Sequence, residues 1–411
     1  MRTNRFQAVD QDLCEYAVIK CFCHKWLRND ILRFIEKTAG IPKEQMILAV
    51  ATDYRPYLVG EAIESVGTFL YQVVTELFDG NAEEIDDHMV PVRVDQRIDG
   101  ITRKMRDVAT LCIMHQLLEH LAKLMLEPLL KARIKQTQHA SIQGRGQTSM
   151  KNQIARYLMA DSIDSNEFAK TDVKGAYKHT KYSVVIRIIE GEIPRGRNVI
   201  TLIKYLARWA PGGHLIIGGY LDAWLFNFVA SYALRFLEAS GRMRRGRFIK
   251  DVSKVSAYMD DFVVIAKTKS GLKRAIRETS EWMKREMELE LVVKVPPTKT
   301  TLIDAAGYQI GRDRTVIRKV IWKRVRRACL RAWTMFQKTG KLRVWMARKI
   351  IAYNGYFRQT NSRSAQKAYH VAELVRIAKR AVRFHAWLAN QKRKEKYDAL
   401  LSRVNGKAGK S

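Results

Sequence analysis

Three aspartates in this sequence end or follow short apolar segments, and their side chains are of the type that holds metal ions. Asp260 and Asp261 come after Tyr258 and Met259 in the middle of 253–266, which alternates and is rich in Val, Ile and Ala. This pattern predicts a β-hairpin with two carboxylates at its turn. Adjacent carboxylates in an apolar hairpin repel each other and lose hydration, so we expect a dication to neutralise them. The alternative is a solvated Asp-Asp turn, which the apolar segments on both sides disfavour.

A third carboxylate, Asp172, comes from a separate predicted strand, Glu167–Val173. If this strand lies beside the hairpin, Asp172 and Asp260 face one pair of metal ions from two directions, and Asp261 supports the site from its edge. We expect Mg²⁺, with Mn²⁺ as an alternative, because Mg²⁺ accepts a few carboxylates and keeps positions for water and substrate phosphates. Two such ions roughly 4 Å apart can activate a 3′-hydroxyl group and stabilise a leaving pyrophosphate.

The charge of the chain indicates a polyanionic partner. Its 411 residues include 74 Lys and Arg against 41 Asp and Glu, a net charge of +33. Residues 311–411 hold 28 Lys and Arg and 4 Asp and Glu. One predicted helix in this region carries a cluster of bases: Lys319, Lys323, Arg324, Arg326, Arg327 and Arg331. Aromatic residues are interleaved there, which favours a nucleic-acid interface over a solvated, solubilising tail.

The predicted elements follow one another in an irregular order, which favours an α+β fold over a doubly wound sheet. Apolar periodicity predicts helices at 10–36, 44–88, 107–133, from 149, from 181, at 270–290 and from 319. Strands are predicted at 90–94, 167–173, 253–266 and in short pieces to 316, with a basic loop at 241–250. The apolar stretch 215–234 contains Asp222 and an early Gly218-Gly219, so we expect a buried helix rather than a membrane span.

Other kinds of site are not favoured. Five irregularly spaced cysteines and the lack of an apolar signal-peptide core at Met1–Arg5 predict free thiols in the cytoplasm. Cys21, Cys23 and His24 have no second ligand pair at zinc-finger spacing, so we expect buried helix residues. The sequence has no two-histidine metalloprotease helix and no P-loop motif.

Several sequence blocks occur in an order that is typical of one enzyme family. The blocks are Asp99–Arg106, Leu126–Leu130, Ser141–Gly146, Asp172–Tyr177, Tyr258–Asp261, Leu289–Lys294 with Lys299, Asp304–Tyr308 and Tyr353–Phe357. Together they resemble the motifs of reverse transcriptases, especially the single-chain bacterial enzymes of retrons, group II introns, diversity-generating elements and phage defence. The resemblance covers roughly residues 90–370, and blocks in order are far more specific than any one block.

The resemblance implies a right-hand polymerase fold with an antiparallel palm sheet that carries the Tyr-Met-Asp-Asp hairpin. The implied units are a helical N-terminal extension (1–90), fingers (91–165), a palm (166–315), a helical thumb (316–390) and a frayed basic tail (391–411). It also implies an RNA-directed DNA polymerase, a nucleotidyltransferase of a bacterial or phage retroelement or antiviral defence system. Its expected partners are an RNA template, a DNA primer or product, dNTPs and a dedicated structured noncoding RNA, with no membrane.

The resemblance further implies roles for individual residues. The catalytic and metal-binding set is Asp172, Asp260 and Asp261, with the backbone carbonyl of Val173 as an additional metal ligand. Tyr177 is expected to exclude a ribose 2′-hydroxyl group, the alternative being a core aromatic residue. Lys294 or Lys299 is expected to protonate pyrophosphate, and the sequence does not choose between them.

A second group of residues is expected to bind the incoming nucleotide. Arg103, Lys104 and Arg106 would neutralise the triphosphate, the alternative being a charged surface hairpin. Gly218 would let the backbone approach a base closely. The basic helix that begins near residue 319 would grip an RNA–DNA duplex by its shape and phosphates.

One block departs from the family pattern. Where these enzymes carry Gly followed by Ser-Pro or Ser-Gln, this chain has Gly218 followed by Asp222 and Ala223. We expect Asp222 to place a negative charge where a template phosphate passes. This motivates a second hypothesis, a specialised polymerase that makes untemplated or noncoding-RNA-templated DNA in phage defence. A third hypothesis is a non-enzymatic RNA-binding protein such as a splicing helper.

Overall fold

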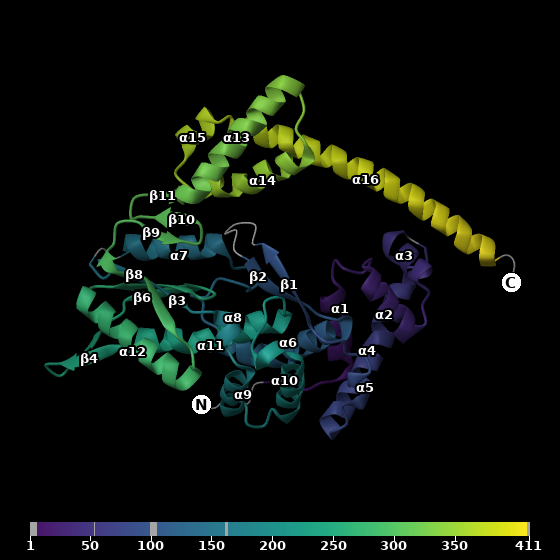
Figure 1. Cartoon of the computed structure of the whole chain (residues 1–411), viewed down its shortest axis with the longest axis horizontal. Helices are drawn as coiled ribbons and strands as arrows, with labels where there is room; N and C mark the ends of the chain where they lie inside the picture. The colour runs from purple at the N-terminus through teal and green to yellow at the C-terminus, as the bar shows by residue number, and fades with distance from the viewer. Residues whose placement is uncertain (1–5, 53, 99–104, 161–162, 409–411) are drawn as a thin grey trace.

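The computed structural model of the chain describes residues 6–52, 54–98, 105–160 and 163–408 (Figure 1). It combines many helices with small antiparallel sheets, so the expected α+β class is correct. The longer helices are α1 (Gln11–Phe22), α2 (Asn29–Ala39), α3 (Lys43–Ala51), α4 (Tyr57–Asp79), α6 (Ile113–Arg133), α7 (Gln147–Ala160), α9 (Tyr182–Glu192), α10 (Arg197–Trp209), α11 (Tyr220–Ala239), α12 (Lys269–Met287), α13 (Lys319–Thr339), α14 (Val344–Arg358) and α16 (Val371–Ala408). The short ones are α5 (Glu83–Asp86), α8 (Ala176–His179), α15 (Arg363–Ala368) and the 3-10 turn η1 (Pro211–Gly213).

The strands form one central sheet and three smaller ones. The central sheet has the order β6 (Lys254–Tyr258), β7 (Asp261–Ala266), β3 (Glu167–Val173) and β8 (Leu291–Lys299). The others are β1 (Arg93–Ile98) with β2 (Met105–Thr110), β4 (Gly241–Arg244) with β5 (Arg247–Lys250), and β9 (Ile303–Ala305), β10 (Tyr308–Ile310) and β11 (Thr315–Ile317). All these pairings are antiparallel.

The central sheet is buried on both faces at its two middle strands. Along β7, Phe262 and Val264 belong to the large core that also holds buried residues of α11 and α12. The residues between them, Val263 and Ile265, belong to a second core with α7, β9 and β10. The period of two of a strand thus sends alternate side chains to opposite layers. Figure 1 shows α12 and α7 on opposite sides of this sheet.

Two sequence predictions in the strand-rich part are wrong. The expected helix 107–133 begins as strand β2, and α6 starts only after Cys112, whose sulfur accepts a hydrogen bond from the amide of His115. The expected basic loop 241–250 is the hairpin β4–β5. Its turn is formed by Arg245 and Gly246, which have φ values of 49° and 75°, the region that two-residue hairpin turns require. Strand pairing therefore overrides local propensity in both places.

The N-terminal helices are shorter than predicted. The expected helix 10–36 is split into α1 and α2, because the chain turns at His24, which has a φ of 62°. Cys21 is buried as expected, but Cys23 is exposed. The stretch 44–88 is divided among α3, α4 and α5. Within the described ranges, no helix has the length and apolar character needed to cross a membrane, and the apolar stretch 215–234 contributes to the buried helix α11.

The C-terminal helices α13, α14 and α16 surround a core of their own, which we call the C-terminal helical cluster. The cluster contacts the three-stranded sheet β9–β10–β11 through Tyr356 of α14, whose ring lies 5.4 Å from that of Tyr308 on β10. The expected frayed tail from 391 is wrong, because α16 is one continuous helix through this region. Its far end leaves the cluster and contacts α3 near the N-terminus (Figure 1).

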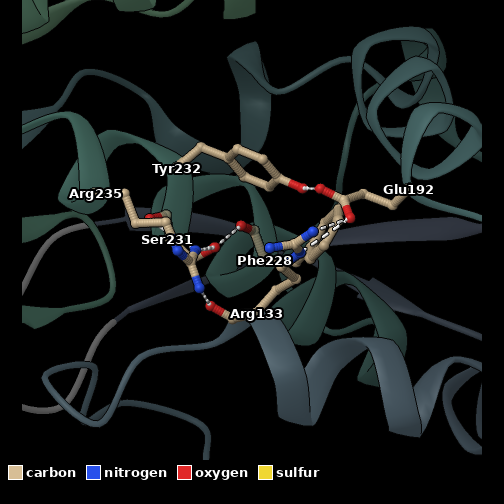
Figure 2. Close-up of polar contacts among 6 residues, drawn as sticks. All are labelled: Arg133, Glu192, Phe228, Ser231, Tyr232 and Arg235. Atoms are coloured by element: carbon tan, nitrogen blue, oxygen red, sulfur yellow. Dashed lines mark hydrogen bonds and ion pairs between the residues drawn. The ribbon is translucent and has the colours of Figure 1, made fainter. Parts of the chain in front are cut away.

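A polar network joins helices α6, α9 and α11 (Figure 2). Glu192 at the end of α9 accepts hydrogen bonds from Arg133 of α6 and from the hydroxyl of Tyr232 on α11. Arg235 of α11 donates to the backbone carbonyl of Arg133 and, at 2.7 Å, to the hydroxyl of Ser231. One carboxylate and two guanidinium groups thus join three helices that come from distant parts of the chain.

Candidate active site

The strand register brings the three predicted aspartates together. In the β3–β7 pairing, Asp172 lies directly opposite Asp261. Asp260 lies in the two-residue turn between β6 and β7, and its carbonyl accepts a hydrogen bond of 3.1 Å from the amide of Val173. The turn also contains Met259 with a φ of 56°, a conformation that L-residues rarely adopt. The hairpin predicted at 253–266 is confirmed, and β3 has the predicted bounds.

The carboxylates repel one another. The pKa of Asp260 is raised from 3.8 to about 6, first by burial and then by the charge of Asp172, with a smaller contribution from Asp261. Lys294 opposes this effect. A site in which burial and like charges raise a carboxyl pKa is stabilised by any cation that binds between the acids.

Lys294 on β8 supplies positive charge at this place. Its Nζ atom lies 2.5 Å from Oδ1 of Asp172 and 3.0 Å from Oδ1 of Asp261. Burial lowers the pKa of Lys294, but the hydrogen bonds to Asp172 and Asp261 and the charges of these two acids together raise it above its usual value. Lys299 lies opposite Glu167, at the other end of β3, and is remote from the aspartates. The structure thus separates two lysines that the sequence left as alternatives.

The donor atoms of this site fit a hard divalent cation. Carboxylate oxygens on two adjacent strands, with the backbone of Val173 beside them, are ligands of the type that Mg²⁺ prefers. As the side chains stand, the described residues contain no group of three Asp, Glu, His or Cys side chains arranged around a single ion position. The ammonium group of Lys294 lies between Asp172 and Asp261, where its positive charge takes the place of a metal ion.

Tyr177 lies close to the aspartates and to β2. It is half-buried, its ring stacks on Phe226 of α11 at 5.7 Å, and it lines a cavity of about 290 Å³. Its pKa is raised by burial first and then by the charges of Asp222 and Asp260, while Arg106 lowers it. Both sequence interpretations of Tyr177 are therefore compatible with its position, since it packs on the core and also faces a cavity.

The structure describes only one of the three basic residues that were predicted to neutralise the triphosphate. Arg106 is exposed on β2, near Tyr177, while Arg103 and Lys104 lie outside the described residues. The hairpin is held to the segment after β3 by an ion pair between Asp107 and Lys178. This contact places β2 beside the predicted nucleotide site.

Gly218 is a glycine for a reason other than the one expected. Its φ is 120°, and a Cβ atom there would lie 2.5 Å from the carbonyl oxygen of Ala109. The amide of Ala109 also donates a hydrogen bond of 2.7 Å to the carbonyl of Ile217. The close approach that requires glycine is therefore made to the backbone at the end of β2.

The expected position of Asp222 along a template path is wrong, because this side chain is fully buried. Its Oδ1 atom accepts a hydrogen bond of 2.5 Å from the hydroxyl of Tyr182, and the amide of Ile216 donates to Oδ2 at 3.3 Å. Burial raises the pKa of Asp222 to about 7, although both hydrogen bonds lower it. Its neighbour is Glu119 of α6, a buried acid whose pKa is raised well above the usual range by burial and by Asp222.

Sequence reasoning did not single out Glu119. An acid among the apolar residues of 113–126 was the available clue, but its pairing with Asp222 depends on the packing of α6 against α11. Glu119 also accepts a hydrogen bond of 2.8 Å from the amide of Tyr220, at the first turn of α11. The acid pair therefore fixes the start of the helix that follows Gly218.

The predicted basic face of α13 is present and gains a partner from α14. Three of the predicted residues, Arg324, Arg327 and Arg331, line a groove of about 320 Å³ together with Lys349 and Tyr353 of α14. Lys319 and Lys323 are exposed on the first turns of α13 and lie outside the lining of this groove. The groove combines cations with an aromatic ring, as nucleic-acid surfaces do.

When the chain is compared with models of known protein families and with curated proteins, no family model and no curated protein matches it.

Proposed function

We propose that this protein is a reverse transcriptase, an RNA-directed DNA polymerase that uses two metal ions. The observation that carries the proposal is the strand register, which sets Asp172 opposite Asp261 beside the turn that holds Asp260. The ordered sequence blocks from 90 to 370 support the same function. A net charge of +33 suits an enzyme whose substrates are nucleic acids.

In this proposal each residue near the turn has a definite task. Asp172, Asp260, Asp261 and the carbonyl of Val173 hold two Mg²⁺ ions, which when bound activate the primer 3′-hydroxyl group and offset charge on the leaving pyrophosphate. Lys294 holds a proton 3.0 Å from Asp261 and is the proposed donor to pyrophosphate.

The residues around the cavity at Tyr177 position the incoming dNTP. The ring of Tyr177, held against Phe226, excludes a ribose 2′-hydroxyl group by steric contact. Arg106 on β2 neutralises triphosphate charge together with Arg103 and Lys104.

The larger units then take the roles of a right-hand polymerase. The central sheet is the palm, the β1–β2 hairpin with α6 and α7 forms the fingers, and the C-terminal helical cluster is the thumb. The groove lined by Arg327, Arg331 and Lys349 grips the phosphates of an RNA–DNA duplex. We place the enzyme in the cytoplasm of a bacterium, in a retroelement or an antiviral defence system that supplies its RNA.

The test is primer extension with purified protein, an RNA template, an annealed DNA primer, dNTPs and Mg²⁺. We expect the parent chain and the matched control Asp313→Asn, an exposed aspartate outside the site, to make template-complementary DNA. Asp260→Asn keeps the size of the side chain but removes its charge, so DNA synthesis should fall by at least about 10²-fold. Equal synthesis by Asp260→Asn and the parent would overturn the proposed site.

A second candidate function is DNA synthesis without a copied template, or from one dedicated noncoding RNA, in phage defence. It is favoured by the departure at Asp222-Ala223, because a buried acid stands where the family carries Ser behind the Gly218 turn. Sequencing of the products separates the two functions, since random or homopolymeric DNA contradicts template-directed copying. A third outcome is that neither the parent nor Asp260→Asn makes DNA, even after host RNA is added, while both bind RNA equally well. This outcome would indicate a non-enzymatic RNA-binding protein.

A further inference from the structure

A second cavity, of about 470 Å³, lies between α1, α6, the loop 135–146 and the first turns of α11. We call it the α11 pocket, and the lining residues that matter most are Tyr16, Lys20, Lys123, Lys131, Tyr220 and Trp224. Its volume falls in the range of roughly 300–1,000 Å³ that is typical of sites for small organic ligands. A single nucleotide unit is of this size class.

The α11 pocket is separate from the candidate active site. Tyr220 and Trp224 are four residues apart and therefore share one face of α11. Asp222 and Phe226 project from the opposite face, where Phe226 stacks on Tyr177. The first turns of α11 thus stand between the pocket and the aspartates, and a ligand in the pocket does not compete with an incoming dNTP.

The wall of the pocket offers a flat aromatic surface. The rings of Tyr220 and His120 are stacked at 3.9 Å with an interplanar angle of 9°. Burial and nearby lysines lower the pKa of His120 to about 3, so its imidazole is neutral at physiological pH. Tyr220 is 37% exposed, so its ring is accessible to a ligand. Aromatic faces of this kind stack on nucleobases without regard to sequence.

The rim of the pocket is positively charged. Glu127 lies 3.0 Å from Nζ of Lys123 and 3.2 Å from Nζ of Lys131, so one acid is shared by two bases. Lys131 keeps 74% of its side chain exposed, and Lys20 on α1 adds a further exposed charge. Cations next to exposed aromatic rings are the usual composition of surfaces that hold single-stranded nucleic acid.

From this geometry we propose that the α11 pocket binds a segment of single-stranded nucleic acid. One base stacks on the Tyr220–His120 pair, and neighbouring phosphates pair with Lys20 and Lys131. A duplex cannot offer an unstacked base to this wall, and a simple anion would leave the aromatic surface uncovered. The site uses none of the aspartates, so it does not depend on the polymerase chemistry proposed above.

The test uses the full-length chain carrying Asp260→Asn, so that no synthesis interferes with binding. Fluorescence anisotropy measures the affinity for a short labelled single-stranded RNA, for single-stranded DNA of the same sequence and for the duplex RNA. We expect Tyr220→Ala to weaken single-strand binding about tenfold or more, because stacking on an aromatic ring is worth roughly 1–3 kcal/mol per base. Tyr220→Phe should restore the parent affinity, since it keeps the ring.

A second variant, in which two lysines of the pocket rim are replaced, tests the proposal even if Tyr220→Ala does not fold. Lys20→Ala with Lys131→Ala should weaken single-strand binding and lower its salt dependence. The matched control is Lys273→Ala with Lys284→Ala, which removes two exposed lysines of α12 and should leave the affinity unchanged. Comparison of the RNA and DNA affinities then tells which strand the pocket prefers.

Crosslinking shows where the strand lies. RNA that contains 4-thiouridine should crosslink to peptides that include Tyr16, Tyr220 or Trp224, and the Tyr220→Ala variant should lose the crosslink to α11. The proposal would be overturned if Tyr220→Ala and the double lysine variant of the pocket both bound the single strand as tightly as the parent. It would also be overturned if the α12 control lost as much affinity as the pocket variants. Duplex RNA that binds as tightly as the single strand and loses affinity equally in Tyr220→Ala would likewise overturn it.

Discussion

Lys294 contributes the positive charge that lies against Asp172 and Asp261, and a pair of buried acids, Glu119 and Asp222, lies behind the candidate active site. In both places carboxyl groups lie close together, where they would repel each other if all of them were ionised. At the hairpin, a cation offsets the repulsion between carboxylates. In the buried pair, the acids retain protons instead, as the raised pKa values of Glu119 and Asp222 indicate.

We expect Lys294→Gln to lower the rate of single-nucleotide addition by about 10²-fold, because the proposed proton donor to pyrophosphate is lost. Lys299→Gln is the matched control, since it removes the same charge from the same strand but far from the aspartates. Rapid-quench measurements under saturating dNTP report the rate, and thermal melts in Mg²⁺ report folding. An equal effect of the two substitutions would contradict the role of Lys294.

The buried acid pair predicts a stability that falls as pH rises. A carboxyl group with a raised pKa in the folded state favours folding at low pH, and this contribution is lost between the unfolded pKa near 4 and the folded value of about 7 for Asp222. Asp222 alone should therefore remove on the order of 3 kcal/mol of unfolding free energy between pH 5 and pH 8, while the buried imidazoles of His115 and His120, whose pKa values are lowered to about 4 and about 3, add stability over the same range.

Glu119→Gln should make this loss smaller, because it removes one of the two buried ionisable groups and puts an amide donor beside Asp222. Urea denaturation at a series of pH values measures the effect. Glu281→Gln, on the exposed face of α12, is the control and should keep the parent slope. A Glu119→Gln slope equal to that of the parent would show that the pair is not the source of the pH dependence.

Helices α6, α9 and α11 are held together by few but partly buried polar contacts at one end. Glu192 is central to them because it accepts from Arg133 and from Tyr232, and its side chain is only 15% exposed. The same helices carry Glu119, Asp222 and the wall of the α11 pocket. The network in Figure 2 therefore supports the packing on which both sites rely.

We expect Glu192→Ala to lower the free energy of unfolding by about 2 kcal/mol, because it leaves Arg133 and the Tyr232 hydroxyl without their acceptor. Glu190→Ala on the same helix is the matched control. Glu190 forms an ion pair with Lys204 at 2.8 Å, but both side chains are largely exposed, so its loss should cost about 0.5 kcal/mol or less. Chemical denaturation of both variants measures the difference, and similar costs would contradict the importance of the network.

At the scale of the whole molecule, α16 joins the two ends of the chain. Its 38 residues span about 57 Å, from the C-terminal helical cluster to α3 (Figure 1). The half-buried side chains near its end recur at helical spacing: Tyr397, Leu400, Leu401 and Val404. Leu400 and Val404 line a cavity with residues of α3 and the following loop. The long helix thus links the proposed thumb to the N-terminal helices.

We expect Leu400→Asp with Val404→Asp to release this end of α16, because two charges would be buried against α3. Hydrogen exchange in α3 and in the last turns of α16 should increase. If the protein is a polymerase, DNA products on a long template should shorten, with an unchanged rate of single-nucleotide addition. Ala399→Asp with Ser402→Asp adds the same charges on the exposed face and should change neither measurement. Equal exchange in all three proteins would show that the contact does not hold α16 in place.

The sequence alone determined the local features of this protein. The bounds of β3, the hairpin at 253–266 with Asp260 at its turn, and the basic face of α13 follow from alternation, turn residues and helical spacing. These patterns act over a few residues, so they can be interpreted without knowledge of the rest of the chain.

Only the tertiary structure decided which distant residues meet. The choice of Lys294 over Lys299 depends on the register of β8 against β3, which includes irregular shifts that no local pattern predicts. The burial of Asp222 depends on its pairing with Glu119, about a hundred residues earlier. The α11 pocket likewise needs α1, α6 and α11 in contact. Register and helix packing are set by the burial of apolar surface across the whole fold, which is why these features appear only when the chain is folded.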